Sequence, residues 1–298
     1  MEVQKLMEGI RRKIGCAVTK KMPVEGHHIA ALMRMAIPDN DGQAWTGTSA
    51  AYQWFETVAL VVLGWAAFLR RSEILQLQTC DLAWYDDRLD ICVRKAKADQ
   101  RSYTATTTVH AATDASELCL WRYFKGYWDN VLLGGTRHPR CTKLLRKEYE
   151  CDHCGYVFPT IDRKQVQRRT PLNTTTMGKR FKAAVVLLEV AGVVPRGQYE
   201  TMSIGSLRKG GNSTAAALGI RDVLREKHGR WGLTARRNLG TAEPEYNMAL
   251  SGEKGGVSWA LHAALNGVRP SGAVADTNGV NSTEGRAMQA HKQKQRKR

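Results

Sequence analysis

An arginine stands beside two glycines at the start of a helical pattern in the stretch SLRKGGNS, residues 206–213. An alanine-rich helical pattern follows, and then a second basic and aromatic cluster, KHGRW, at residues 227–231. The planar fork of an arginine matches two oxygens of one phosphate and stays protonated near neutral pH. Glycines beside it let a backbone or a ligand come close. Taken alone, the stretch is interpreted more simply as an arginine on a solvated helix face, but a second arginine segment upstream changes that interpretation.

The second segment is LRRSEILQL, residues 69–77, with Asp81 just beyond it. Together the two segments resemble the catalytic domain of the tyrosine recombinase (phage integrase) family. That family carries one arginine in an LRxSEL-type turn and a second in an HxxR box, with a hairpin lysine between them. A His or Trp and then a nucleophilic tyrosine follow. The resemblance covers roughly residues 9–250, with the motifs in this order, and it implies the catalytic-domain fold of the family.

The resemblance implies that Arg70 and Arg208 bind the target phosphate. Attack on a phosphodiester builds negative charge on the phosphorus oxygens, and two arginines from distant segments neutralise it from two directions. The lysine is Lys97, in the connection KAKADQ of residues 95–100, and its role is to protonate the leaving 5′-oxygen as a general acid. Lys95 is the alternative for this role. Each lysine is also consistent with an ordinary solvated turn.

The nucleophile implied by the resemblance is Tyr246, the only tyrosine after Tyr199. Its hydroxyl would form a covalent 3′-phosphotyrosine that a second DNA end reverses, with Trp231 positioning the substrate. This cycle needs no metal or nucleotide cofactor. We therefore expect a site-specific recombinase or integrase, encoded by a mobile element, that acts on double-stranded DNA as a homo-oligomer, a tetramer on paired sites.

Two departures from the family pattern keep other functions open. Gly205 stands where the HxxR box has its histidine, and His228 is the nearest replacement in the sequence. The interval between Trp231 and Tyr246 is also longer than is typical of the family. A decayed or domesticated DNA-binding protein of the same fold, without catalysis, is therefore the second hypothesis. A type IB topoisomerase, which uses similar residues, is a weaker third.

Composition agrees with a polyanionic partner. The 298 residues include 45 Lys and Arg against 28 Asp and Glu, which gives a formal charge of +17. Such an excess favours nucleic acid first and an anionic membrane second. The longest apolar run, residues 57–69, is too short to span a bilayer, and residues 1–12 lack the apolar core of a signal peptide. With an odd number of cysteines, seven, we expect an intracellular protein on DNA, nuclear if eukaryotic.

Hydrophobic periodicity predicts a mainly α protein with a small antiparallel β-sheet (α+β). We expect residues 1–22 to be a basic linker or the remnant of an N-terminal DNA-clamping domain, and residues 23–250 the catalytic domain. A C-terminal helix within 251–266 and a disordered basic tail, 267–298, follow. The expected helices cover residues 27–37, 52–69, 116–128, 177–190, 206–218, 220–227 and 257–265; the expected strands cover 82–93 and 102–109, and a basic loop covers 161–175.

A region within residues 134–155 carries an HxxC pair and a CxxC pair that the family pattern does not require. Zinc takes four nitrogen or sulfur ligands in a tetrahedron, and two ligands spaced by two residues can reach one ion from a tight turn. The pattern suggests an inserted structural zinc knuckle, although a loop with incidental thiols fits it too. The candidate ligands are His138, Cys141, Cys151 and Cys154.

Overall fold

The computed structural model of the chain describes residues 21–36, 49–93, 105–112, 118–132, 154–161, 166–230 and 257–267. These residues form a mainly helical body with two small antiparallel sheets, so the predicted α+β class is confirmed. The helices are α2 (Gly26–Ala36), α3 (Ser49–Ala66), α4 (Arg71–Gln76), α5 (Leu120–Asn130), α7 (Thr174–Val190), α8 (Gly205–Ala217), α9 (Asp222–His228) and α11 (Val257–Leu265), with the 3-10 turns η1 (Thr79–Asp81) and η2 (Gln198–Thr201).

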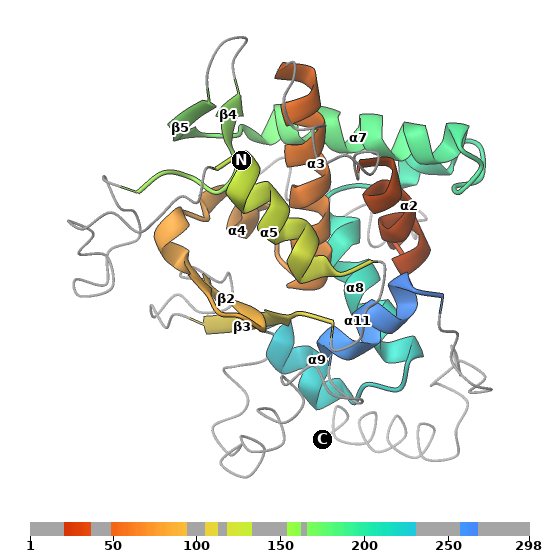
Figure 1. Cartoon of the computed structure of the whole chain (residues 1–298). Helices are drawn as coiled ribbons and strands as arrows, with labels where there is room; N and C mark the ends of the chain where they lie inside the picture. The colour runs from red at the N-terminus through yellow and green to blue at the C-terminus, as the bar shows by residue number, and fades with distance from the viewer. Residues whose placement is uncertain are drawn as a thin grey trace, which may run out of the picture.

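Helix α3 forms the centre of the molecule. Every residue from position 55 to position 69 is buried, because this helix is apolar on all sides and has no polar stripe to turn toward water. Helices α2, α5, α7 and α8 all pack against it, and Figure 1 shows α5 crossing in front of it and α7 across its upper end. The prediction of a core helix here is confirmed, but the helix ends at Ala66, three residues earlier than predicted. Phe68 adopts a left-handed φ of 48°, which stops the helix.

The first sheet is three-stranded and antiparallel, with β1 (Leu82–Trp84), β2 (Arg88–Val93) and β3 (Ala105–His110); in Figure 1, β2 and β3 lie below α5 and above α9. The prediction of one strand over residues 82–93 is wrong, because a turn at Asp86 and Asp87 divides it into two paired strands. Aspartate is disfavoured in strands and favoured in turns. The alternate residues Leu89, Ile91 and Val93 are buried under the helices.

A second sheet pairs β4 (Pro159–Ile161) with β5 (Val166–Pro171), where a basic loop was predicted. Two adjacent arginines interrupt the polar-apolar alternation that identifies a strand, and the second of them, Arg169, is exposed. Helix α7 then begins at Thr174, earlier than predicted, because the Asn173 side chain accepts a hydrogen bond from the Thr176 N–H at 2.7 Å and caps it.

The two glycines of the stretch SLRKGGNS let helix α8 touch its neighbours backbone to backbone. A Cβ added to Gly210 would lie 1.7 Å from the Val24 carbonyl oxygen, and one added to Gly211 would lie 2.3 Å from that of Trp65. The Trp65 indole N–H also donates to the Val24 carbonyl at 2.8 Å. The sequence left open whether these glycines make room for a backbone or for a ligand. In the structure, the backbone of Val24 and Trp65 fills the space beside them. The glycines thus fix α8, and with it Arg208, against the end of α3.

None of the helices in the described ranges is both long and apolar enough to pass through a membrane.

Candidate active site

The first half of the candidate site is built by the LRRSE segment. Arg70 stands just before α4 in an extended conformation, and its backbone N–H donates to Glu73 Oε2 at 2.7 Å. Its guanidinium Nη1 donates to the other carboxylate oxygen, Oε1, also at 2.7 Å. A carboxylate three residues into a helix can satisfy donors at the helix start, which explains this local arrangement. The Glu73 side chain is 1% exposed, whereas that of Arg70 is 27% exposed.

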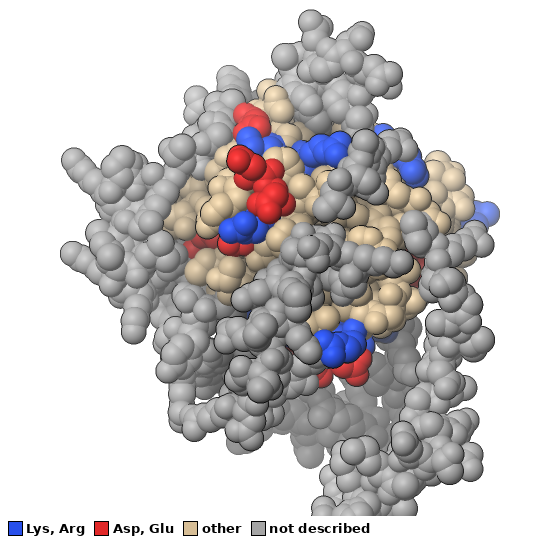
Figure 2. All heavy atoms as spheres, turned by 60° about the horizontal axis from the view of Figure 1, so that its bottom comes forward, with Lys and Arg blue, Asp and Glu red and all other residues tan. Residues whose placement is uncertain are grey.

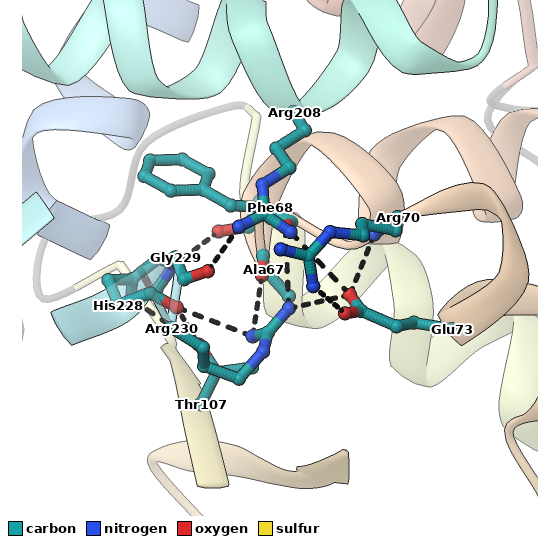
Figure 3. A network of polar contacts seen from close by, with 10 residues as sticks. Ala67, Phe68, Arg70, Glu73, Thr107, Arg208, His228, Gly229 and Arg230 are labelled. Atoms are coloured by element: carbon teal, nitrogen blue, oxygen red, sulfur yellow. Dashed lines mark hydrogen bonds and ion pairs between the residues drawn. The ribbon is translucent and has the colours of Figure 1, made fainter. Parts of the chain in front are cut away.

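The second half comes from helix α8, which brings Arg208 to the same carboxylate. Arg208 Nη1 lies 3.8 Å from Glu73 Oε2, and Nη2 donates to the Gly229 carbonyl at 2.5 Å. Figure 3 shows the Arg70 and Arg208 guanidinium groups side by side above Glu73. The structure therefore brings together the two arginines that the sequence placed in one site.

A third arginine, Arg230, lies beneath them, and sequence analysis did not select it. Its Nη2 donates to Glu73 Oε2 at 2.8 Å and to the Phe68 carbonyl at 3.3 Å. Its Nη1 donates to the Ala67 and His228 carbonyls, both at 3.3 Å. The side chain is 1% exposed and the residue has a left-handed φ of 58°. Arg230 therefore satisfies carbonyls at the end of α3 and holds Glu73 from below (Figure 3).

The cluster of Arg70, Glu73, Arg208 and Arg230 carries more positive than negative charge. Three guanidinium groups surround one carboxylate, so these four side chains together carry a net positive charge. Burial lowers the pKa of Arg208 to about 9, and repulsion from Arg70 and Arg230 adds to this effect. Burial alone would raise the pKa of Glu73, but Arg230, Arg70 and Arg208 together hold it below its usual value. An anion bound beside Arg70 and Arg208 would relieve this excess.

His228 is a structural residue rather than a replacement for the histidine missing at Gly205. It is 1% exposed, and its Nε2 lies 2.8 Å from the Ala66 carbonyl, which requires the hydrogen on Nε2. Its Nδ1 lies 3.5 Å from Thr107 Oγ1. Burial lowers the pKa of His228 to about 4, so the ring is neutral at physiological pH. The imidazole links α9 to α3 and β3, and its Nε2 hydrogen is buried and bound to the Ala66 carbonyl, so it does not face a substrate.

The other predicted site residues lie outside the described ranges. These are the catalytic candidates Lys97, Trp231 and Tyr246, the alternative Lys95, and the zinc candidates His138, Cys141 and Cys151. The fourth zinc candidate, Cys154, is described and buried. The described ranges hold no group of three or more His, Cys, Asp or Glu side chains arranged for a metal ion.

The positive charge of the chain is not gathered on the described part of the face in Figure 2. There the Lys and Arg side chains stand apart, and several lie beside Asp or Glu.

No model of a known protein family matches the chain, and no curated protein matches it. Two solved structures that resemble its fold are complexes of the XerH site-specific recombinase. The pre-cleavage complex with difH substrate has a TM-score of 0.45 at 12% identity, over 76% of this chain and 53% of that one. The post-cleavage complex with palindromic difH substrate has a TM-score of 0.45 at 10% identity, over 78% and 54%. This chain spans about half the length of those chains, and similarity at this level carries no argument about function.

Proposed function

We propose that this chain is a DNA strand-transferase of the tyrosine recombinase type, which cuts and rejoins specific DNA sites through a covalent 3′-phosphotyrosine. The observation that carries the proposal is the meeting of Arg70 and Arg208 at Glu73. These arginines belong to the two distant segments that suggested the family, and the chemistry of that family requires them to share one phosphate. The chemistry of that family requires the two arginines to lie close together, and here they do so at Glu73.

The cluster has an inner and an outer layer, which suggests how it would bind a phosphate. Glu73 and Arg230 are each 1% exposed and form the inner layer, while the side chains of Arg70 and Arg208 are 27% and 10% exposed. The inner pair holds the outer guanidinium groups in fixed positions before any ligand arrives. Such preorganised donors stabilise the charge that develops on phosphorus oxygens during attack.

The remaining roles follow from the resemblance and belong to this proposal. Lys97, or alternatively Lys95, protonates the leaving 5′-oxygen, Tyr246 attacks the phosphorus, and Trp231 positions the substrate. The strands on either side of residues 95–100 support the role proposed for Lys97 or Lys95. Val93 of β2 pairs with Ala105 of β3, and two residues further along β3, Thr107 contacts His228, close to Arg230. The partner is double-stranded DNA, bound by a homo-oligomer on paired sites.

A nicked DNA substrate tests this function. The full chain is mixed with a pool of duplexes that carry a nick and a randomised flank, because the target sequence is not known. Denaturing electrophoresis then separates covalent adducts from bound DNA. We expect an adduct with the wild type and with Tyr199→Phe, whose hydroxyl lies exposed near Glu200, and none with Tyr246→Phe. An adduct that persists in Tyr246→Phe contradicts the assignment of the nucleophile.

A non-catalytic DNA-binding protein of the same fold is the second candidate, and Gly205 together with the buried His228 favours it. Among the residues that the structure describes, a Cβ added at position 205 meets only Ser203 Oγ, at 3.6 Å, so these residues leave room for a side chain there. If the chain is a slow enzyme, Gly205→His should raise the rate of adduct formation by a factor on the order of 10². If neither protein forms an adduct while both bind DNA, the non-catalytic function is correct.

A further inference from the structure

Helix α7 is apolar on two sides, and only one of them is buried against the rest of the protein. The residues of the buried side are Met177, Phe181, Ala184, Val185 and Leu188. The second side carries Ala183, Val186, Leu187 and Val190, which recur every three or four residues and therefore share one face of the helix. These four residues form the outer face of α7.

The outer face of α7 exposes large apolar side chains to water. Val186, Leu187 and Val190 are 39%, 45% and 80% exposed. They are three of the five large hydrophobic side chains that are exposed within the described residues, and the other two, Met35 and Tyr85, lie outside α7. Figure 1 shows α7 along the top of the molecule. Single exposed apolar residues are ordinary, but several on one face mark a surface for a partner.

Two charges beside the outer face of α7 fit a two-fold symmetric contact. Lys182 and Glu189 are seven residues apart, about two helical turns, so they lie on the same flank of that face. A two-fold axis perpendicular to the helix reverses its direction and keeps each flank beside the same flank of the second copy. An axis midway between Lys182 and Glu189 brings each lysine opposite the other copy's glutamate. That midpoint lies about 1.5 Å along the helix from the centre of the outer face, so charge and apolar contacts agree.

We propose that the outer face of α7 is an interface with a second copy of this chain, in which the two α7 helices pack antiparallel. Val186 and Leu187 lie closest to the axis, so they pack on their counterparts in the second copy. Ala183 packs against Val190 of the second copy, which places a small residue opposite a larger one. The four residues of the outer face carry no charge, so the face does not suit DNA, which is bound mainly through its phosphates.

Lys182 is held in place at the edge of this interface. Its Nζ donates to the Tyr199 carbonyl at 2.6 Å and to the Glu200 carbonyl at 3.0 Å. Since an ammonium group has three hydrogens, these two bonds leave one for Glu189 of the second copy.

The interface leaves the cluster of candidate catalytic arginines accessible. Helix α7 contacts the first half of α3 through the ion pair of Arg180 with Glu56. The arginine cluster lies beyond the other end of α3, at the carbonyls of Ala67 and Phe68. The proposed dimer therefore does not rest on the proposed strand transfer, and it can be measured without DNA.

Sedimentation equilibrium of the full chain without DNA tests the interface. We expect the wild type to show a monomer–dimer equilibrium. Leu187→Glu and Val190→Glu each place a carboxylate on the outer face of both copies and should raise the dissociation constant of the dimer at least about 100-fold. Both side chains are exposed, so the variants should fold like the wild type. The matched control is Tyr85→Glu, which changes a 44% exposed residue between β1 and β2 and should dimerise like the wild type.

A charge exchange tests the antiparallel arrangement. Glu189→Lys and Lys182→Glu should each weaken their own dimer, because each places like charges opposite one another. A mixture of the two variants should form a heterodimer that is tighter than either homodimer. Parallel helices would place the two flanks on opposite sides, so mixing would gain nothing.

Three results would overturn the proposal. The first is a wild type that stays monomeric at every concentration, which would assign the outer face to another segment of this chain or to a different protein. The second is an unchanged dimer in Leu187→Glu, and the third is a mixture without a preferred heterodimer. The Leu187→Glu result remains decisive if Lys182→Glu, which loses its bonds to η2, fails to fold.

Discussion

Replacing Arg230 with methionine removes the inner support of the arginine cluster while keeping much of its volume. Arg230 and Glu73 are each 1% exposed and lie 2.8 Å apart, and breaking such a buried pair costs about 3–5 kcal/mol. Arg70 and Arg208 continue to face the carboxylate, which moves the expected cost to about 3 kcal/mol, the lower end of that range. This is a large share of the 5–15 kcal/mol that is typical of a domain, yet the variant should still fold.

Urea unfolding at neutral pH measures this cost as a lower midpoint with an unchanged slope. Lys125→Met is the matched control, because its ion pair with Asp129 is exposed and should be worth less than about 1 kcal/mol. In a double-mutant cycle with Glu73→Gln, the coupling energy between the two positions should exceed about 1 kcal/mol. The reasoning is refuted if Arg230→Met is no more destabilising than Lys125→Met.

Three further predictions concern packing, pH and DNA. Gly211→Ala should lower the free energy of unfolding by at least about 2 kcal/mol, because the added Cβ would lie 2.3 Å from the Trp65 carbonyl oxygen. Gly178→Ala is the control: no described residue lies within 4 Å of its added Cβ, so it should be neutral or raise the free energy of unfolding by up to about 1 kcal/mol. Equal effects of the two substitutions in urea unfolding would contradict this. Because burial lowers the pKa of His228 to about 4, the unfolded chain binds the proton more readily, so the contribution of His228 to stability is complete above pH 6.5 and is lost as the pH falls toward 4. His228→Gln should therefore lose less stability than the wild type between these pH values. Burial raises the pKa of Glu56 to about 8, which changes stability with pH in the opposite direction, but both proteins contain Glu56 and its contribution cancels in the comparison. Identical pH profiles of stability would count against this prediction. If about six phosphates are contacted, DNA affinity should fall roughly 10³-fold between about 50 and 200 mM salt, as measured by fluorescence anisotropy, and a flat response would exclude an electrostatic contact.

The sequence could predict the helices because their signals are local. The apolar run of α3 and the turn glycines, Gly192 and Gly219 with φ of 71° and 81°, each mark an element by themselves. The strands were harder to predict. A pair of aspartates divides β1 from β2, and the arginines of β5 conceal its alternation. Short strands depend on partners that a local pattern does not contain.

The outer layer of the candidate site was predictable and the inner layer was not. Arg70 and Arg208 stand in recognisable motifs, so the sequence could place them together. Arg230 gave only a weak signal, its position in the KHGRW cluster, where the resemblance directed attention to Trp231. Its importance comes from carbonyls at the end of α3 and from Glu73, more than 150 residues earlier in the chain.

The most direct test of the central claim removes the charge that Arg208 is proposed to neutralise. The phosphate at which the wild type forms its adduct is first located and then replaced by a neutral methylphosphonate. Arg208→Ala should form no adduct on the natural phosphate, because the transition-state charge lacks its partner. On the methylphosphonate, Arg208→Ala should form the adduct again, while Tyr246→Phe should form none on either substrate. If Arg208→Ala is as active as the wild type on the phosphate, or stays inactive on the methylphosphonate while the wild type reacts there, then Arg208 does not neutralise that phosphate and the account is wrong.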